Sequence, residues 1–121
     1  MILSGGWDCT VFVWDIRQTK PAASFFGPCI SGDSIDYKNN IILTGSYREK
    51  NSIELWDIRN FEKLCDINTK TRTGNQINYV STCQFSASKG DQKSYIIAGS
   101  SMSNVVGLYC KDLVYDLDLE I

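Results

Sequence analysis

An internal repeat, marked by the tetrapeptide Trp-Asp-Ile-Arg, constrains the fold of this chain more than any other feature. Three segments share one order: a small residue, Gly, then Gly or Ser, a polar turn, an apolar run and an aromatic residue. They are SGGWDCTVFVWDIR (4–17), TGSYREKNSIELWDIR (44–59) and AGSSMSNVVGLYCK (98–111). The closing aromatics Trp14, Trp56 and Tyr109 follow one another at intervals of 42 and 53 residues. A repeat of this length indicates an array of similar supersecondary units.

The apolar runs of each unit are short, and Gly, Asn, Ser and Lys clusters separate them, so they predict β-strands. Two strands precede each of the later aromatics, and a further strand follows each aromatic, which makes a complete unit of four antiparallel strands. We therefore predict eleven strands in three groups. An incomplete unit over residues 1–26 lacks its first strand, and complete units span 29–68 and 79–121.

Gly-Ser before a turn and Trp-Asp at the end of the third strand, at a period near 42, resemble the WD-repeat family of β-propellers. The resemblance covers essentially the whole chain and is strongest in the first two repeats, because Tyr109-Cys110 replaces Trp-Asp in the third. It implies an all-β partial β-propeller of four-stranded antiparallel blades. The matching repeat positions are Gly5, Asp8, Trp14, Gly45, Trp56, Gly99 and Tyr109.

A propeller needs at least four blades to close, so this chain cannot close a ring by itself. The blades at the two ends should each leave one apolar face without a neighbour. We expect the missing blades to come from the same protein, of which this chain is then a fragment, from a partner chain or from self-association.

Catalytic and metal chemistry find little support in the sequence. The absence of histidine removes the commonest general base and metal ligand, and it also removes the histidine of the family's Asp-His-Ser-Trp hydrogen-bond network. No phosphate-binding glycine motif or nucleophile motif occurs. Asp116, Asp118 and Glu120 alternate with apolar residues, and we interpret them as the solvated face of an outermost strand rather than a metal site. We expect no catalytic residue, cofactor or metal.

The charge balance and the cysteines limit the expected binding partners and the expected cellular location. The net charge is −2 and no run of Lys or Arg occurs, so neither nucleic acid nor a membrane surface is an expected partner. No apolar stretch has the length of a membrane helix. Five dispersed cysteines without C-x-x-C favour reduced, packed thiols, over a disulfide framework or a zinc site, and therefore a cytoplasmic or nuclear location.

The repeated Trp-Asp-x-Arg motif has two interpretations. In the structural one, the tryptophans pack between blades, the aspartates bond turn amides and the arginines are exposed. In the functional one, tandem motifs of this kind resemble those of substrate receptors that dock on the adaptor of cullin-RING ubiquitin ligases. The residues that match are Asp15, Arg17, Asp57 and Arg59. We predict a non-catalytic protein–protein interaction scaffold; a ubiquitin-ligase substrate receptor is the alternative, and a small enzyme with a site between blades is the third hypothesis.

Overall fold

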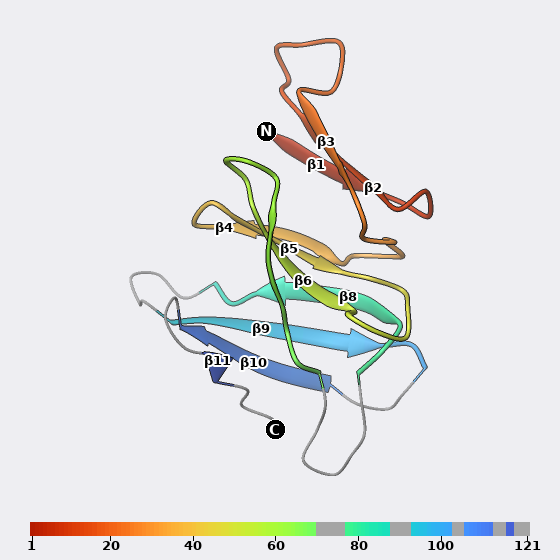
Figure 1. Cartoon of the computed structure of the whole chain (residues 1–121), viewed down its shortest axis with the longest axis vertical. Helices are drawn as coiled ribbons and strands as arrows, with labels where there is room; N and C mark the ends of the chain where they lie inside the picture. The colour runs from red at the N-terminus through yellow and green to blue at the C-terminus, as the bar shows by residue number, and fades with distance from the viewer. Residues whose placement is uncertain (70–76, 88–92, 103–105, 113–115, 118–121) are drawn as a thin grey trace.

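The computed structural model of the chain describes residues 1–69, 77–87, 93–102, 106–112 and 116–117. These residues form eleven β-strands in three antiparallel sheets and contain no helix (Figure 1). The predicted all-β class is thereby confirmed, as is the grouping into one three-stranded and two four-stranded sheets. Within the described part of the chain, no helix is long and apolar enough to cross a membrane.

Every hydrogen-bonded ladder joins strands that follow one another in the sequence. Sheet 1 has the order β1-β2-β3, formed by Ile2–Gly5, Thr10–Trp14 and Ala23–Phe26. Sheet 2 has the order β4-β5-β6-β7, formed by Ile35–Lys38, Ile41–Gly45, Ile53–Asp57 and Lys63–Asp66. Sheet 3 has the order β8-β9-β10-β11, formed by Val80–Phe85, Lys93–Ser100, Val106–Asp112 and Asp116–Leu117. The predicted acidic face of the outermost strand comprises Asp116, Asp118 and Glu120, and the last two lie outside the described residues.

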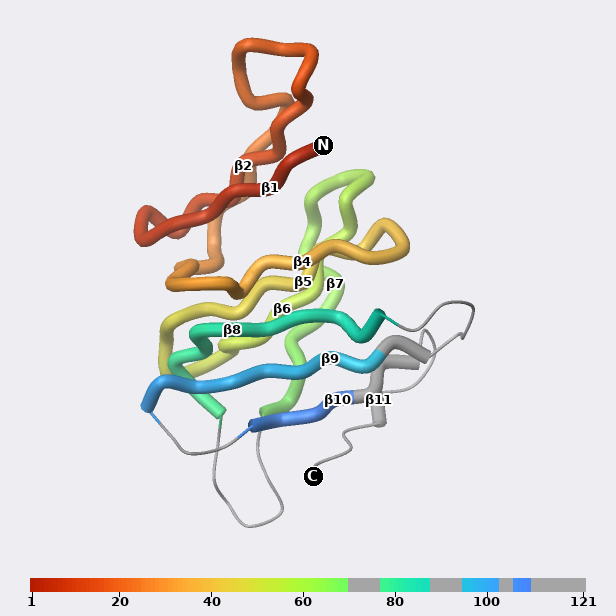
Figure 2. Tube along the Cα trace, turned by 180° about the vertical axis from the view of Figure 1, so that it is seen from behind, coloured from red at the N-terminus to blue at the C-terminus, as the bar shows by residue number. Residues whose placement is uncertain are grey.

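The three sheets follow one another through the molecule, and the first strand of each complete sheet lies next to the preceding sheet. Strand β1 packs beside β4, while β4 and β5 pack beside β8 (Figure 2). Backbone hydrogen bonds reinforce both junctions: the Ile30 amide donates to the Gly6 carbonyl (3.0 Å), and the Val80 amide donates to the Ser46 carbonyl (3.1 Å). Each sheet is thus fixed to its neighbour by main chain as well as side chains.

Each sheet has two chemically different faces, because successive side chains of a strand point to opposite sides. We call the face that carries Trp14, Trp56 or Tyr109 the aromatic face. The opposite, aliphatic face carries the alternate residues of the same strands: Val11 and Val13 in sheet 1, Ile53 and Leu55 in sheet 2, Val106 and Leu108 in sheet 3.

Two hydrophobic cores lie between the sheets, and both have the same construction. In one core, Val11 and Phe25 of sheet 1 pack against Trp56 of sheet 2. In the other, Ile53 and Leu55 of sheet 2 pack against Tyr109 of sheet 3. An aliphatic face therefore meets an aromatic face at each junction. Strand β6 is buried along its whole length because sheet 2 has a neighbour on both sides.

Two of the repeat glycines allow the sheets to approach closely. A Cβ atom at Gly5 would lie 2.6 Å from Ile30 Cγ1, and one at Gly45 would lie 2.5 Å from Val80 Cγ1. Both distances are far below van der Waals contact, so a larger residue would force the neighbouring sheet away. The glycine at this position of β1 and of β5 therefore leaves room for residues of the segment that packs against it.

The prediction that all cysteines are reduced is wrong for two of them. Cys9, in the turn between β1 and β2, forms a disulfide with Cys29, in the connection from sheet 1 to sheet 2. The two cysteines are 20 residues apart in the sequence and come together only after the chain has folded back along β3. The sequence alone therefore did not predict that they pair. Cys83 is a free, buried thiol, and burial raises its pKa to about 12, as predicted for a packed cysteine.

Candidate functional site

The two Trp-Asp-Ile-Arg motifs build the same turn twice, once after β2 and once after β6. In the first turn, the Arg17 amide donates to Asp15 Oδ1 (3.0 Å). In the second, the Arg59 amide donates to Asp57 Oδ1 (2.9 Å). A carboxylate that accepts from the amide two residues later is a common way to start a turn. The turn role predicted for the two aspartates is confirmed.

Each arginine also closes back on its own aspartate. Arg17 donates from Nε to Asp15 Oδ1 (2.9 Å) and from Nη2 to Oδ2 (2.6 Å). Arg59 repeats the arrangement on Asp57, with distances of 3.0 and 2.8 Å. A bidentate pair of this kind fixes the plane of the guanidinium group. We call the two pairs the Asp-x-Arg clamps.

The clamps hold their charged groups in place while leaving them open to solvent. The arginine side chains are 85% exposed at position 17 and 75% exposed at position 59. Hydrogen bonds from the Arg17 side chain, and then from its amide, lower the pKa of Asp15 to about 2. The same two interactions with Arg59 lower the pKa of Asp57. Both carboxylates are therefore charged at neutral pH, and both arginines present rigid, exposed guanidinium groups.

The third repeat has no such clamp, because Cys110 stands where the aspartate would be. The four residues named from the motif are therefore brought together only as two separate pairs, one on sheet 1 and one on sheet 2. The second pair is more firmly packed, since the side chain of Asp57 is 11% exposed and that of Asp15 is 26% exposed.

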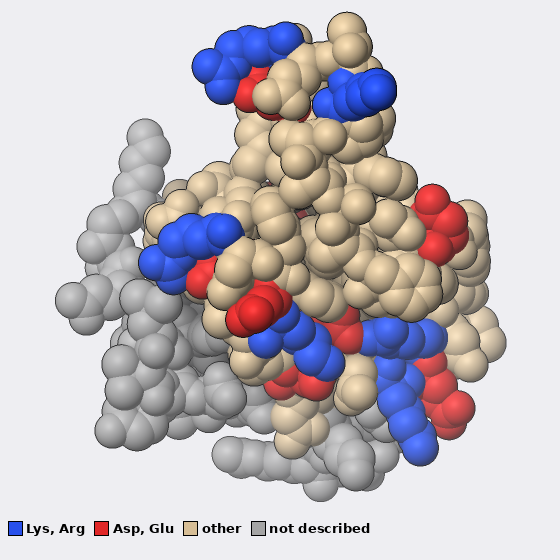
Figure 3. All heavy atoms as spheres, turned by 45° about the horizontal axis from the view of Figure 1, so that its top comes forward, with Lys and Arg blue, Asp and Glu red and all other residues tan. Residues whose placement is uncertain are grey.

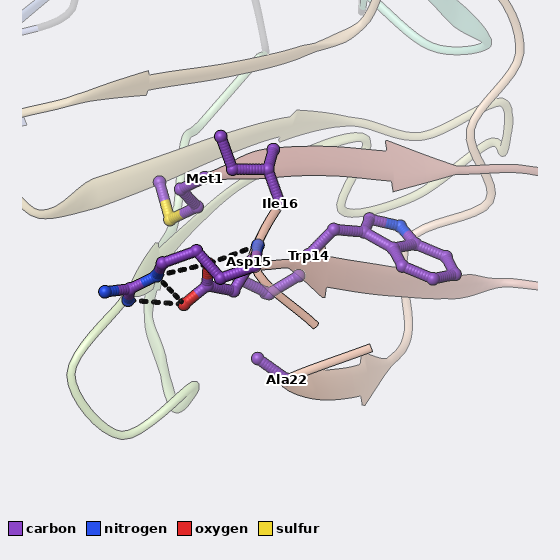
Figure 4. A pocket seen from close by; sticks show the side chains of 7 residues that line it. Met1, Trp14, Asp15, Ile16 and Ala22 are labelled. Carbon is purple, nitrogen blue, oxygen red and sulfur yellow. Dashed lines mark hydrogen bonds and ion pairs between the residues drawn. The ribbon is translucent and has the colours of Figure 1, made fainter. Parts of the chain in front are cut away.

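A hollow of about 460 Å³ opens beside the first clamp (Figure 4). Met1, Trp14, Ile16 and Ala22 form its apolar part, and the Asp15–Arg17 pair lies at its edge. Ile16 is largely exposed there. The hollow therefore combines apolar surface with an exposed ion pair, a combination suited to a partner that places an apolar side chain beside a polar group.

A hydrogen bond behind each clamp fixes the tryptophan that begins the motif. The Trp14 indole donates to Ser4 Oγ (2.8 Å), and the Trp56 indole donates to Thr44 Oγ1 (3.0 Å). Sequence reasoning missed these bonds, although the signal was present as a hydroxyl residue directly before the repeat glycine in the first two units. Ala98 takes that position in the third unit. Asp8 acts locally, accepting from the Thr10 amide (3.2 Å).

A row of aromatic rings near the turns that follow β1 and β5 was also missed. Trp7 contacts Tyr47 with ring centroids 5.4 Å apart, and Tyr47 contacts Tyr79 at 5.2 Å. These residues come from three positions far apart in the sequence, and no periodicity connects them. The row links the ends of successive sheets, with Trp7 as its exposed member.

The charged groups of the described surface are mixed in sign. On the face shown in Figure 3, Lys and Arg side chains lie beside Asp and Glu rather than in one continuous basic area. In the part of the chain that the structure describes, no group of three or more His, Cys, Asp or Glu residues is placed to hold a metal ion.

No protein-family model matches the chain, and no curated protein matches it.

Proposed function

We propose that the three sheets are successive blades of a WD-repeat type β-propeller and that the chain serves as a non-catalytic scaffold for binding other proteins. The observation that carries the proposal is the pair of Asp-x-Arg clamps, which present two rigid, exposed guanidinium groups from the same turn of adjacent sheets. Arginine is a frequent anchor in protein interfaces because it combines a planar set of donors with an apolar stem. Rigid strands behind the turns reduce the entropy lost on binding.

The repeated sheets support the propeller part of the proposal. Four-stranded antiparallel units, small residues at the close approaches, and a tryptophan bonded to a hydroxyl residue agree with the resemblance seen in the sequence.

A binding experiment tests the scaffold function. The immobilised chain is exposed to an extract of its source cells, and the retained proteins are quantified for the wild type and for an Arg17→Glu/Arg59→Glu variant. We expect a defined set of proteins on the wild type and a loss of about tenfold or more on the variant. Lys20→Glu, a charge reversal at an exposed position outside the clamps, is the matched control and should retain the set. Equal retention by wild type and double variant would contradict the role of the clamps.

The tandem arrangement of the clamps favours a second candidate function, that of a substrate receptor docking on the adaptor of cullin-RING ubiquitin ligases. The two exposed arginines match that motif position by position. Purified adaptor should then bind the wild type and not an Arg17→Ala/Arg59→Ala variant. Equal recovery of the adaptor with both chains, or with neither, would exclude the receptor function and leave the general scaffold.

A further inference from the structure

Two faces of the stack remain uncovered by any described segment, one at each end. The aromatic face of sheet 1 is open, and the large apolar side chains on it are partly or highly exposed. Phe26 is 76% exposed and Ile2 is 54% exposed. Phe12 and Trp14 lie between them, with ring centroids 5.9 Å apart. Because Ile2 is directly opposite Trp14, and Thr10 directly opposite Phe26, these side chains share one face.

The aliphatic face of sheet 3 is open in the same way. Val106 is 63% exposed and Ile97 is 50% exposed, and Leu108 lies directly opposite Ile97 on the neighbouring strand. Gln84, directly opposite Ile97 on β8, is uncharged, and its side-chain amide donates to Asp33 Oδ2 (3.1 Å). A surface of this composition is typical of an interface rather than of a solvated sheet.

The interior of the molecule shows how two such faces fit. At both internal junctions an aliphatic face packs on an aromatic face, and Phe25 of sheet 1 lies 4.6 Å from Trp56 of sheet 2 between ring centroids. The open face of sheet 1 repeats the receiving side, with a tryptophan bonded to a hydroxyl residue. A hollow of about 380 Å³ lies at this end, and its lining includes Ser4, Phe12 and, from the turn between β1 and β2, Trp7 and Asp8. The open face of sheet 3 repeats the inserting side, since Val106 and Leu108 take the places of Ile53 and Leu55.

We propose that a second copy of this chain occupies these faces, with the aliphatic face of sheet 3 of one copy packed on the aromatic face of sheet 1 of the other. One chain carries both halves of the junction, and the contact continues the interfaces already formed inside it. The side chains at the centre of the contact, Phe12 and Trp14 of one copy and Ile97 of the other among them, are uncharged, so no unpaired charge is buried there. The association is head to tail, because the two surfaces that meet are different.

Sedimentation velocity of the purified full chain between 1 and about 100 µM tests the proposal. We expect the wild type to exceed its monomer mass of 13.6 kDa as the concentration rises. Phe12→Glu should disable the aromatic face and Ile97→Glu the aliphatic face. Each places a carboxylate in the junction, so each variant alone should associate at least about tenfold more weakly. Leu64→Glu, at an exposed leucine of β7 away from both faces, should associate like the wild type.

A mixture of the two variants distinguishes head-to-tail contact from a symmetric one. Phe12→Glu retains the aliphatic face and Ile97→Glu retains the aromatic face, so an equimolar mixture should form a dimer although neither variant does so alone. Phe26→Glu and Val106→Glu replace them if circular dichroism shows that either of the first pair has lost its fold. A monomeric wild type at 100 µM, normal association of Ile97→Glu alone, or no dimer in the mixture would overturn the proposal. None of these results affects the retention of other proteins through the clamps.

Discussion

Replacing each of the two motif tryptophans by phenylalanine should give very different losses of stability, although the two residues are equivalent in the repeat. Trp56 is 8% exposed, and its indole bond to Thr44 is buried. Trp14 makes the same bond to Ser4 on an open face. Water can therefore replace the hydrogen bond of Trp14, but it cannot reach the buried bond of Trp56.

The expected magnitudes follow from burial. Trp56→Phe removes the buried hydrogen bond from the indole to the Thr44 hydroxyl, which should cost about 1 kcal/mol. The missing part of the indole ring leaves a cavity of roughly 40 Å³, which costs about 1 kcal/mol more. Trp14→Phe should cost about 0.5 kcal/mol, because water fills the space and bonds Ser4. The difference between the two variants is about 1.5 kcal/mol.

Urea denaturation followed by far-UV circular dichroism at 1 µM measures both losses, with Trp7→Phe at an exposed position as the control. The midpoint should fall clearly for Trp56→Phe and only slightly for the other two variants. Equal losses for Trp56→Phe and Trp14→Phe in the monomer would refute the assignment of one covered and one open aromatic face.

Two further predictions concern the first sheet. Hydrogen bonding to Arg17 lowers the pKa of Asp15 from 3.8 to about 2, so the clamp stabilises the folded chain above about pH 4, and this contribution is lost as the pH falls toward 2. In an NMR titration of the side-chain carboxyl carbon, Arg17→Ala should raise the Asp15 midpoint only part of the way toward 3.8, because the amide of residue 17 still donates to Asp15 Oδ1. An unchanged midpoint would contradict the clamp. For the disulfide, a non-reduced digest should contain the peptide joined through Cys9 and Cys29, and Cys9→Ser/Cys29→Ser should lower the free energy of unfolding by about 3 kcal/mol, as expected for a loop of this length. Absence of the joined peptide, or a double variant as stable as the oxidised wild type, would show that the bond does not form.

The strands were predictable because their determinants are local. Period-two alternation, glycine-containing turns and the repeated motif lie within a few residues of one another, and they gave the number and grouping of the strands. The turn role of Asp15 and Asp57 was predictable for the same reason, since donor and acceptor are two residues apart.

The features that the sequence did not predict depend on residues brought together by the stacking of the sheets. The contact of Trp7 with Tyr47 and the bond between Cys9 and Cys29 both require the chain to pass from sheet 1 to sheet 2. The cytoplasmic or nuclear location was inferred from reduced cysteines, and the disulfide removes that support.

The consecutive pairing of all described strands has a consequence for how the molecule opens. No ladder depends on another sheet, so the sheets behave as a short one-dimensional array in which each gains stability from its immediate neighbours. Sheet 2 has two neighbours and sheet 1 has one, so local opening should begin at sheet 1 rather than in the middle. The Cys9–Cys29 bond fastens that end to the connection into sheet 2, and it limits the freedom gained when sheet 1 separates. Oxidation therefore links one end sheet of the array to the chain that enters the sheet with two neighbours.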